Sequence, residues 1–225
     1  MIRGGACPLL LTQLGYWDDG DGCVFLGWER QGEADAETAT GVIVESFVHI
    51  TSKGNRGACL YPNRADYLFF LQRLRMDAIA HGVSVHAYCL MPNHFHLLVE
   101  VADRPVSTFM HGLLQRHAQY INRLYRHRGH VFADRFWSKR CDYDFYFLAV
   151  LGYIHLNPIR AGLTRNVAQY PWSSHRAYIG REEAPWVNTR ALELFSPDRG
   201  IAIGMFAQFV ELQAFGLRHQ RRLVG

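Results

Sequence analysis

The sequence predicts an α+β domain in which an antiparallel sheet carries helices on one face. Short β-branched and aromatic segments alternate with longer segments whose apolar residues recur at helical spacing. Their order is strand, helix, strand, strand, helix and then more helix, which is typical of a layered α+β arrangement. The 225 residues are 49% hydrophobic and 13% aromatic, which is enough apolar material to build a core of this size.

The first strand and helix follow a less regular N-terminal segment. Residues 1–40 are rich in Gly, Ala, Asp and Glu, and we expect them to form a poorly ordered extension. Residues 42–51 are β-branched and aromatic and predict a strand. A basic glycine loop follows at 52–57. Residues 63–80 then carry apolar side chains at helical spacing, and Gly82 is expected to end that helix.

The next elements are a hairpin and a long helix. Residues 83–90 and 94–101 read as strands, and the turn at 91–93 joins them. Residues 105–126 carry an apolar stripe at helical spacing and predict the second helix. This succession favours a ferredoxin-like or RRM-like sheet.

Helices dominate the rest of the chain. Residues 145–156 predict a helix that ends at Asn157, because a proline disfavours helical geometry in the residue before it. Two weaker helices are expected near 189–195 and 199–214. The predicted organisation is an extension over 1–40, a catalytic domain over 41–180 and a C-terminal helical extension over 181–225.

Composition restricts the cellular setting. The five cysteines form no C-x-x-C pair, so a disulfide framework is not expected and a reducing cytoplasm fits best. No apolar run reaches the ~18 residues that a membrane-spanning helix needs, so no membrane partner is expected. The formal net charge of +4 does not by itself identify a nucleic-acid partner.

Two histidines alternate along the predicted third strand. His94 and His96 share one face of the strand, whereas Phe95 and Leu97 point to the other face and into the core. Neutral imidazole is a common metal ligand, so the pair predicts half of a metal site whose third ligand comes from elsewhere in the fold. The alternative is a pair of ordinary surface histidines.

A tyrosine and an asparagine lie four residues apart on a predicted helix. Tyr153 and Asn157 therefore share a helix face. An amide oxygen suits a hard cation, and a tyrosine close to a metal-bound phosphate can act as a nucleophile. The alternative is a half-buried helix aromatic and an asparagine that caps the helix before Pro158.

His49 is a further candidate, predicted from strand geometry. If Val48 and Ile50 face the core, His49 faces the opposite side of the sheet. The first and third strands of a ferredoxin-like sheet are neighbours. His49 would then lie beside His94 and His96, where it could support a metal ligand or contact a phosphate.

Cations and aromatic residues are interleaved between residues 113 and 141. Cations for phosphates and rings for unstacked bases are what single-strand binding needs. The alternative is a solvated basic helix with core aromatics. The candidate DNA-binding residues are Lys53, Arg56, Arg116, Arg123, Arg135, Lys139 and Arg140.

Two motifs closely resemble one family of bacterial enzymes. They are Ala-Tyr-Cys-Leu-Met-Pro-Asn-His-Phe-His-Leu-Leu at 87–98 and Tyr-Ile-His-Leu-Asn-Pro-Ile-Arg-Ala-Gly at 153–162. They resemble the REP-associated tyrosine transposases, which belong to the single-tyrosine HUH transposase class. Further similar segments lie at 49–56, 129–136 and 171–174, so the resemblance covers about residues 42–180.

The resemblance implies a specific chemistry. It implies that His94, His96 and Asn157 bind a divalent ion, Mg²⁺ or Mn²⁺, and that Tyr153 is the nucleophile. Mn²⁺ is the easier ion chemically, because imidazole is not the favourite ligand of Mg²⁺. It also implies cleavage and rejoining of single-stranded DNA near palindromic hairpins through a 5′-phosphotyrosine. Some relatives exchange the tyrosine helix between subunits, so a homodimer is possible.

Two other functions stay open at this point. The protein could be a host hairpin-DNA-binding protein that has lost transposition. It could also be a metal-dependent nuclease that uses activated water, with Tyr153 in a structural role.

Overall fold

The computed structural model describes residues 46–102, 104–141 and 145–224. All of them belong to one compact unit, Ala36–Gly225. The extension predicted for residues 1–40 and the first residues of the strand predicted at 42–51 lie outside the described residues.

The described chain builds a four-stranded antiparallel sheet in the order β2-β3-β1-β4. The succession of elements is the ferredoxin-like βαββαβ, so the predicted fold class is confirmed. The first and third strands are neighbours, as expected. The fourth strand was not predicted from the sequence. The elements are β1 (Ser46–Lys53), α1 (Arg64–His81), β2 (Ser84–Met91), β3 (His94–Val101), α2 (Val106–Leu124) and β4 (Trp137–Cys141).

The C-terminal half adds helices and short turns of 3-10 helix. A 3-10 helix stands where a weak helix was expected near 189–195, and the last helix extends well beyond residue 214. These elements are α3 (Phe145–Arg160), η3 (Val167–Gln169), α4 (His175–Tyr178), η4 (Arg190–Leu194) and α5 (Arg199–Val224), and η2 (Asn55–Gly57) lies in the loop after β1.

Local signals place the ends of α1. The Asn63 side chain accepts a hydrogen bond from the Ala65 backbone N–H, and the Asp66 carboxylate accepts one from the Asn63 N–H, which forms a capping box. Gly82 ends the helix in the left-handed conformation with φ 66°. The sequence had predicted this termination.

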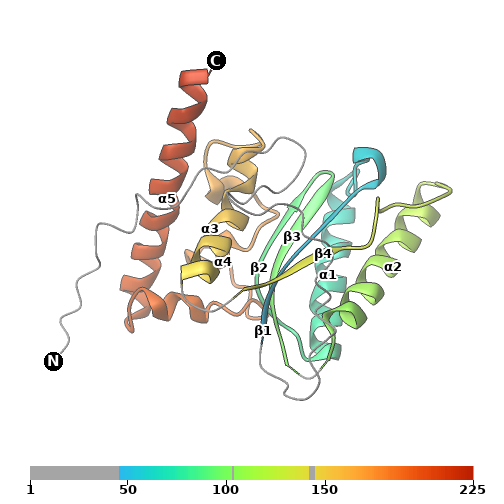
Figure 1. The fold of residues 1–225 in the computed structure, drawn as a ribbon, viewed down its shortest axis with the longest axis horizontal. Helices are drawn as coiled ribbons and strands as arrows, with labels where there is room; N and C mark the ends of the chain where they lie inside the picture. Colours follow the sequence, from blue (N-terminus) through green and yellow to red (C-terminus); the bar gives the residue numbers. More distant parts are fainter. Residues whose placement is uncertain (1–45, 103, 142–144, 225) are drawn as a thin grey trace. The chain divides into compact units, whose positions relative to one another are not determined.

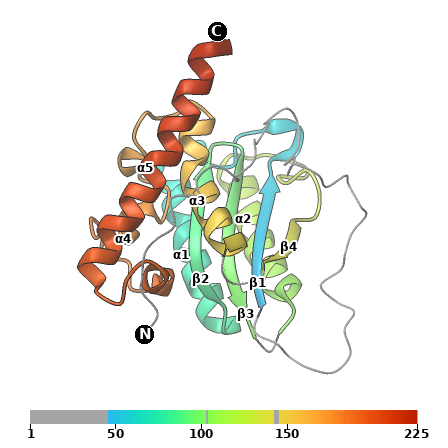
Figure 2. The same cartoon turned by 60° about the vertical axis from the view of Figure 1, so that its left-hand side comes forward.

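Helices cover both faces of the sheet (Figures 1 and 2). On one face, Phe95 of β3 packs on Phe70 of α1 with ring centroids 5.0 Å apart, and Val48 and Ile50 are buried as predicted. The Asp77 carboxylate of α1 binds Arg116 of α2 at 2.8 Å and joins the two helices of this layer. Helix α3 packs on the opposite face. The helices predicted on one face are α1 and α2, and α3 adds a second layer.

Helix α3 runs through Pro158 and ends at Arg160, so the end predicted at Asn157 is wrong. Pro158 cannot donate to the Ile154 carbonyl, which leaves an acceptor without its backbone partner. The Asn157 side-chain amide supplies donors instead: its Nδ2 lies 3.0 Å from Tyr153 O and 3.5 Å from Ile154 O. Because the side-chain amide takes the place of the missing backbone donor, the helix can continue to Arg160.

Helix α5 packs on α3 and η4 through Ala202, Phe206 and Val210, which are buried. By length and composition its segment Arg199–Leu217 could cross a membrane, whereas the sequence led us to expect no such helix. Length and composition alone are weak grounds for a span, because buried core helices meet the same criteria.

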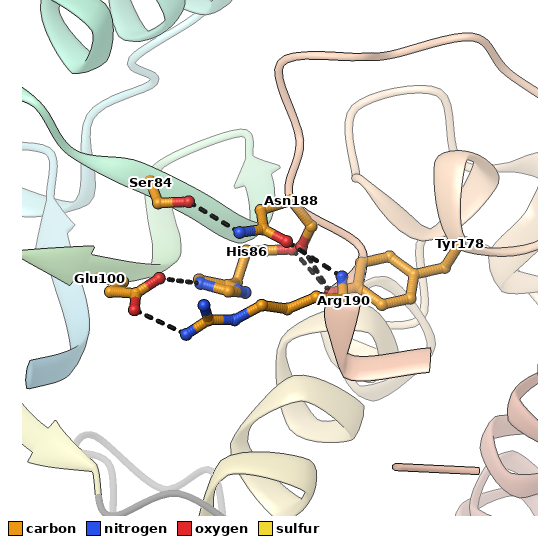
Figure 3. A network of polar contacts seen from close by, with 6 residues as sticks. All are labelled: Ser84, His86, Glu100, Tyr178, Asn188 and Arg190. Carbon is orange, nitrogen blue, oxygen red and sulfur yellow. Dashed lines mark hydrogen bonds and ion pairs between the residues drawn. The ribbon is translucent and has the colours of Figure 1, made fainter. Parts of the chain in front are cut away.

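A polar network ties the C-terminal region to the edge of the sheet (Figure 3). The Glu100 carboxylate of β3 binds His86 Nε2 at 3.0 Å and the Arg190 guanidinium at 2.6 Å. Asn188 Nδ2 donates to Ser84 Oγ at 3.0 Å. The segment predicted as an extension over 181–225 therefore packs directly on the sheet, and the boundary placed near residue 180 stays a prediction.

Replacing Glu100 by alanine is expected to destabilise the fold by about 2 kcal/mol, since hydrogen bonds to charged groups contribute roughly that much and His86 would lose its partner inside the protein. Urea unfolding followed by circular dichroism measures the free energy of unfolding. The exposed Glu183 provides the control, Glu183→Ala. Equal stability of the two variants would show that the network contributes nothing.

Candidate active site

Three histidines gather on the face of the sheet that α3 covers. The register pairs Lys53 with His94 and Thr51 with His96, and paired residues of antiparallel strands share a face. The rings of His94 and His96 are 5.2 Å apart. His49 Nε2 lies 3.2 Å from His96 Nδ1, so His49 takes the place beside the pair that strand geometry predicted.

Helix α3 brings Tyr153 onto this cluster. Its ring centroid lies 5.4 Å from that of His96 and 6.0 Å from that of His49, and both pairs meet edge to face. Tyr153 is only 6% exposed. The Arg160 guanidinium carbon lies 5.2 Å from the centre of the Tyr153 ring, at a distance typical of a cation–π contact.

Asn157 lies one turn after Tyr153 and is buried. Its amide nitrogen donates to the carbonyls of Tyr153 and Ile154, so only Oδ1 is left to act as a ligand atom. The cap-like role and the ligand role predicted from the sequence therefore use different atoms of one side chain.

Hydrogen bonds define which histidine nitrogens can bind a cation. His94 Nδ1 lies 2.8 Å from Asn93 Oδ1, and because an amide oxygen only accepts, Nδ1 carries the proton and Nε2 keeps its lone pair. His96 can offer Nε2 in the same way when its Nδ1 donates to His49 Nε2.

Burial keeps the two inner histidines neutral. Desolvation, with a smaller contribution from Lys139, lowers the pKa of His49 to about 4. Burial, with the neighbouring His49 and His94, holds the pKa of His96 well below its usual value. Neutral imidazole is the form that coordinates metals.

The donor set fits a divalent cation. Two imidazole nitrogens and one amide oxygen mix borderline and hard ligands, which suits Mn²⁺ better than Mg²⁺. Within residues 46–102, 104–141 and 145–224, no group of three or more His, Cys, Asp or Glu side chains is arranged to hold a metal. The candidate ligand set has only two side chains of these types, His94 and His96, and its third ligand is the amide oxygen of Asn157.

The part of the chain that carries these residues is similar to a known protein family. Residues 63–157 match the family of IS200-like transposases. The matched segment contains His94, His96, Tyr153 and Asn157, and it agrees with the class that the sequence motifs resemble. A search among curated proteins finds no match.

Two solved structures are similar to this chain to different degrees. A REP-associated tyrosine transposase, solved with a REP hairpin, is similar with a TM-score of 0.55 and 16% identity, over 66% of this chain and 88% of that one. A chain from Deinococcus radiodurans R1 described as a transposase has 18% identity over 48% of this chain and 87% of its own, with a TM-score of 0.37. The similarity to the first structure supports the fold of this chain and, at 16% identity, nothing beyond the fold.

The predicted DNA-binding cations lie in separate groups on the structure. Lys53 and Arg56 are exposed at and just after the end of β1, where Lys53 pairs with His94 of β3, and Lys139 of β4 pairs with His49 of β1. Arg116 and Arg123 are on α2, in the layer on the other face, where Arg116 binds Asp77.

The two remaining predicted cations lie on and before β4. Arg140 is exposed on β4 and donates to Ser46 Oγ at 2.7 Å, and Arg135 is exposed just before that strand. The role of each predicted cation toward DNA stays a prediction.

Sequence reasoning missed two neighbours of the site. Arg160 follows Tyr153 by seven residues, two helical turns, but the helix was expected to end before it. Trp137, 44% exposed on β4, meets His49 edge to face at 5.6 Å. The sequence marked Trp137 only as one of several aromatics, because β4 itself was not recognised.

Proposed function

We propose that this protein cleaves and rejoins single-stranded DNA at palindromic hairpins, with Tyr153 as the nucleophile and His94, His96 and Asn157 as ligands of Mg²⁺ or Mn²⁺. The observation that carries the proposal is the position of the Tyr153 ring against His96, 5.4 Å away, inside a segment of the IS200-like transposase family. The DNA partner is suggested by the solved relative, which is described as bound to a REP hairpin.

The covalent step is a transesterification. The Tyr153 oxygen forms a bond to phosphorus while the P–O3′ bond breaks, and the phenol proton passes to solvent. The leaving strand takes up a proton and departs with a free 3′-hydroxyl, and the other strand stays on Tyr153 as a 5′-phosphotyrosine. Because the ester energy is retained, a 3′-hydroxyl can reverse the step and join a strand.

The residues around Tyr153 have separate tasks in this proposal. A bound divalent ion would withdraw charge from the phosphate and orient it. His94 and His96 would bind this ion through Nε2, and His49 would orient the ring of His96 through the hydrogen bond at Nδ1. Arg160 holds the face of the Tyr153 ring, and Lys53 and Arg56 supply positive charge for the strand.

The test uses a hairpin oligonucleotide with a single-stranded tail, labelled at either its 5′ or its 3′ end and incubated with Mn²⁺. We expect a protein–DNA adduct that survives denaturing electrophoresis and carries only the 3′-end label. Mass spectrometry should place the phosphoryl group on the peptide containing Tyr153. EDTA should prevent the adduct.

The other outcomes separate the competing functions. Cleavage without any adduct would identify a nuclease that uses water. Hairpin binding without cleavage under any divalent ion would identify a binding protein that has lost transposition. Sedimentation of the protein with and without DNA would show whether a homodimer forms, and a cytoplasmic location stays an expectation.

His49→Ala is expected to weaken Mn²⁺ binding about 10- to 100-fold, which is the usual effect of losing a group that orients a histidine ligand. Isothermal titration calorimetry measures the affinity. The exposed His111 on α2 supplies the control, His111→Ala. An unchanged affinity in His49→Ala would remove His49 from the support of the metal site.

A further inference from the structure

An open cavity of about 350 Å³ lies beside His94, and neither His96 nor Tyr153 is among the described residues that line it. The loop after β1, the turn between β2 and β3 and the end of α3 form its walls. This volume is at the lower end of the ~300–1,000 Å³ of small-ligand pockets, so it suits one small planar group. Its lining includes Cys59, Met91, Pro92, Asn93, His94 and Leu163.

Backbone hydrogen bonds hold all three walls in place. Leu60 N donates to Pro92 O at 2.7 Å, and Gly54 N donates to Asn93 O at 2.7 Å, which attaches the β1 loop to the turn. Leu163 N donates to Pro158 O at 2.8 Å and fixes the third wall at the end of α3. The cavity is therefore preformed and costs little ordering on binding.

The lining combines apolar surface with a hydrogen-bond donor, which is the combination that a nucleobase requires. Met91, Pro92 and Leu163 offer apolar contact to a flat face. Asn93 accepts a hydrogen bond from His94 through Oδ1, which leaves its amide nitrogen to donate to a base edge.

Positive charge surrounds the same end of the sheet. Lys53 is exposed and pairs with His94 in the sheet register, and Arg56 is exposed in the loop that forms one wall. Cations at the rim with an apolar interior favour a nucleotide, whose phosphate is charged and whose base is not. His94 belongs both to this cavity and to the proposed metal site, so a group bound here is adjacent to the reacting phosphate.

We propose that this cavity binds one unstacked base of the DNA strand, next to the phosphate that Tyr153 attacks, and so contributes to the choice of cleavage position. The inference rests on the proposed function, because it takes single-stranded DNA as the ligand.

The first experiment fills the cavity and removes single bases from the DNA. Hairpin oligonucleotides carry one abasic residue at successive positions of the single-stranded tail, and fluorescence anisotropy measures binding to each. We expect an abasic residue at one position to weaken wild-type binding about tenfold.

Leu163→Trp should bind the intact oligonucleotide about tenfold more weakly and should lose sensitivity to an abasic residue at that position. Leu163 is 46% exposed, so the larger ring can be accommodated without disturbing the core, and Leu194→Trp, at a leucine 40% exposed, is the control.

The second experiment needs no substitution at the cavity. Cys59 is exposed, whereas Cys89 and Cys141 are buried, so N-ethylmaleimide should modify Cys59 preferentially among these three. Mass spectrometry of its peptide gives the rate. Intact oligonucleotide should slow modification at least about fivefold, and the oligonucleotide abasic at the sensitive position should restore most of the rate.

The outcomes distinguish this inference from the proposed function. If one abasic position weakens binding and releases Cys59 but no adduct forms, the base site stands and the cleavage proposal fails. If an adduct forms while every abasic position acts alike on wild type and Leu163→Trp, the base site is overturned and the cleavage proposal stands. Absence of any oligonucleotide binding overturns both.

Discussion

Tyr153→Phe is expected to reduce formation of the covalent DNA adduct by about 10³-fold or more, because the change removes the oxygen that bonds to phosphorus in the proposed step. Hairpin binding should stay within about twofold of wild type, since the ring and its contacts with His96 and Arg160 remain. The measurement combines denaturing electrophoresis of the adduct with anisotropy on the same oligonucleotide. The divalent ion is held constant in all samples.

Tyr146 on the same helix provides a matched control, because Tyr146→Phe also removes one phenol oxygen from α3. It should form the adduct at close to the wild-type rate. Cleavage by Tyr153→Phe at the wild-type rate would rule out the tyrosine mechanism and leave the nuclease that uses water. Loss of both activities in Tyr146→Phe would instead point to a general effect on the helix.

His96→Ala is expected to weaken Mn²⁺ binding by about 100-fold or more and to abolish metal-dependent adduct formation. His96 contacts His49, His94 and Tyr153, so its ring is the centre of the cluster. Calorimetry with Mn²⁺ gives the affinity, and adduct formation at rising Mn²⁺ concentration shows whether excess metal restores activity.

Folding has to be checked separately for this variant, because His96 is buried. His96→Asn keeps a polar side chain of smaller size and offers an oxygen ligand, so partial recovery with Mn²⁺ is expected. The exposed His111→Ala should bind metal as the wild type does. A His96→Ala protein that is folded and binds Mn²⁺ with wild-type affinity would contradict the metal site.

The sequence was sufficient for the elements with strong periodicity or local signals. β3 was predicted at its observed bounds, and the end of α1 at Gly82 was predicted as well. β4 was missed because Trp-Ser-Lys-Arg-Cys shows no alternation of apolar and polar residues. It is a five-residue strand at the edge of the sheet, where it pairs with β1. Its existence depends on a partner more than 80 residues earlier in the chain, which no local pattern reports.

In the candidate site, too, the features with a local sequence signal could be predicted and those that depend on packing could not. Alternation on the strands was enough to place His49, His94 and His96 on one face, and the resemblance supplied Tyr153. The covering of that face by α3 could not be predicted, because it depends on tertiary packing. Arg160 was missed for a local reason: the general effect of Pro158 on helices was overcome by the side chain of Asn157.

The placement of α3 over the sheet has a consequence for folding. The histidines come from β1 and β3 and the tyrosine from a helix that begins more than 40 residues after β3, so the cluster consists of long-range contacts. Such contacts form slowly, because the intervening chain has to close into a loop before they can be made. A nascent or partly unfolded chain would thus lack Tyr153 beside the proposed metal ligands. If the protein cuts DNA as proposed, that ability would be confined to the fully assembled fold, which would limit damage by incomplete molecules.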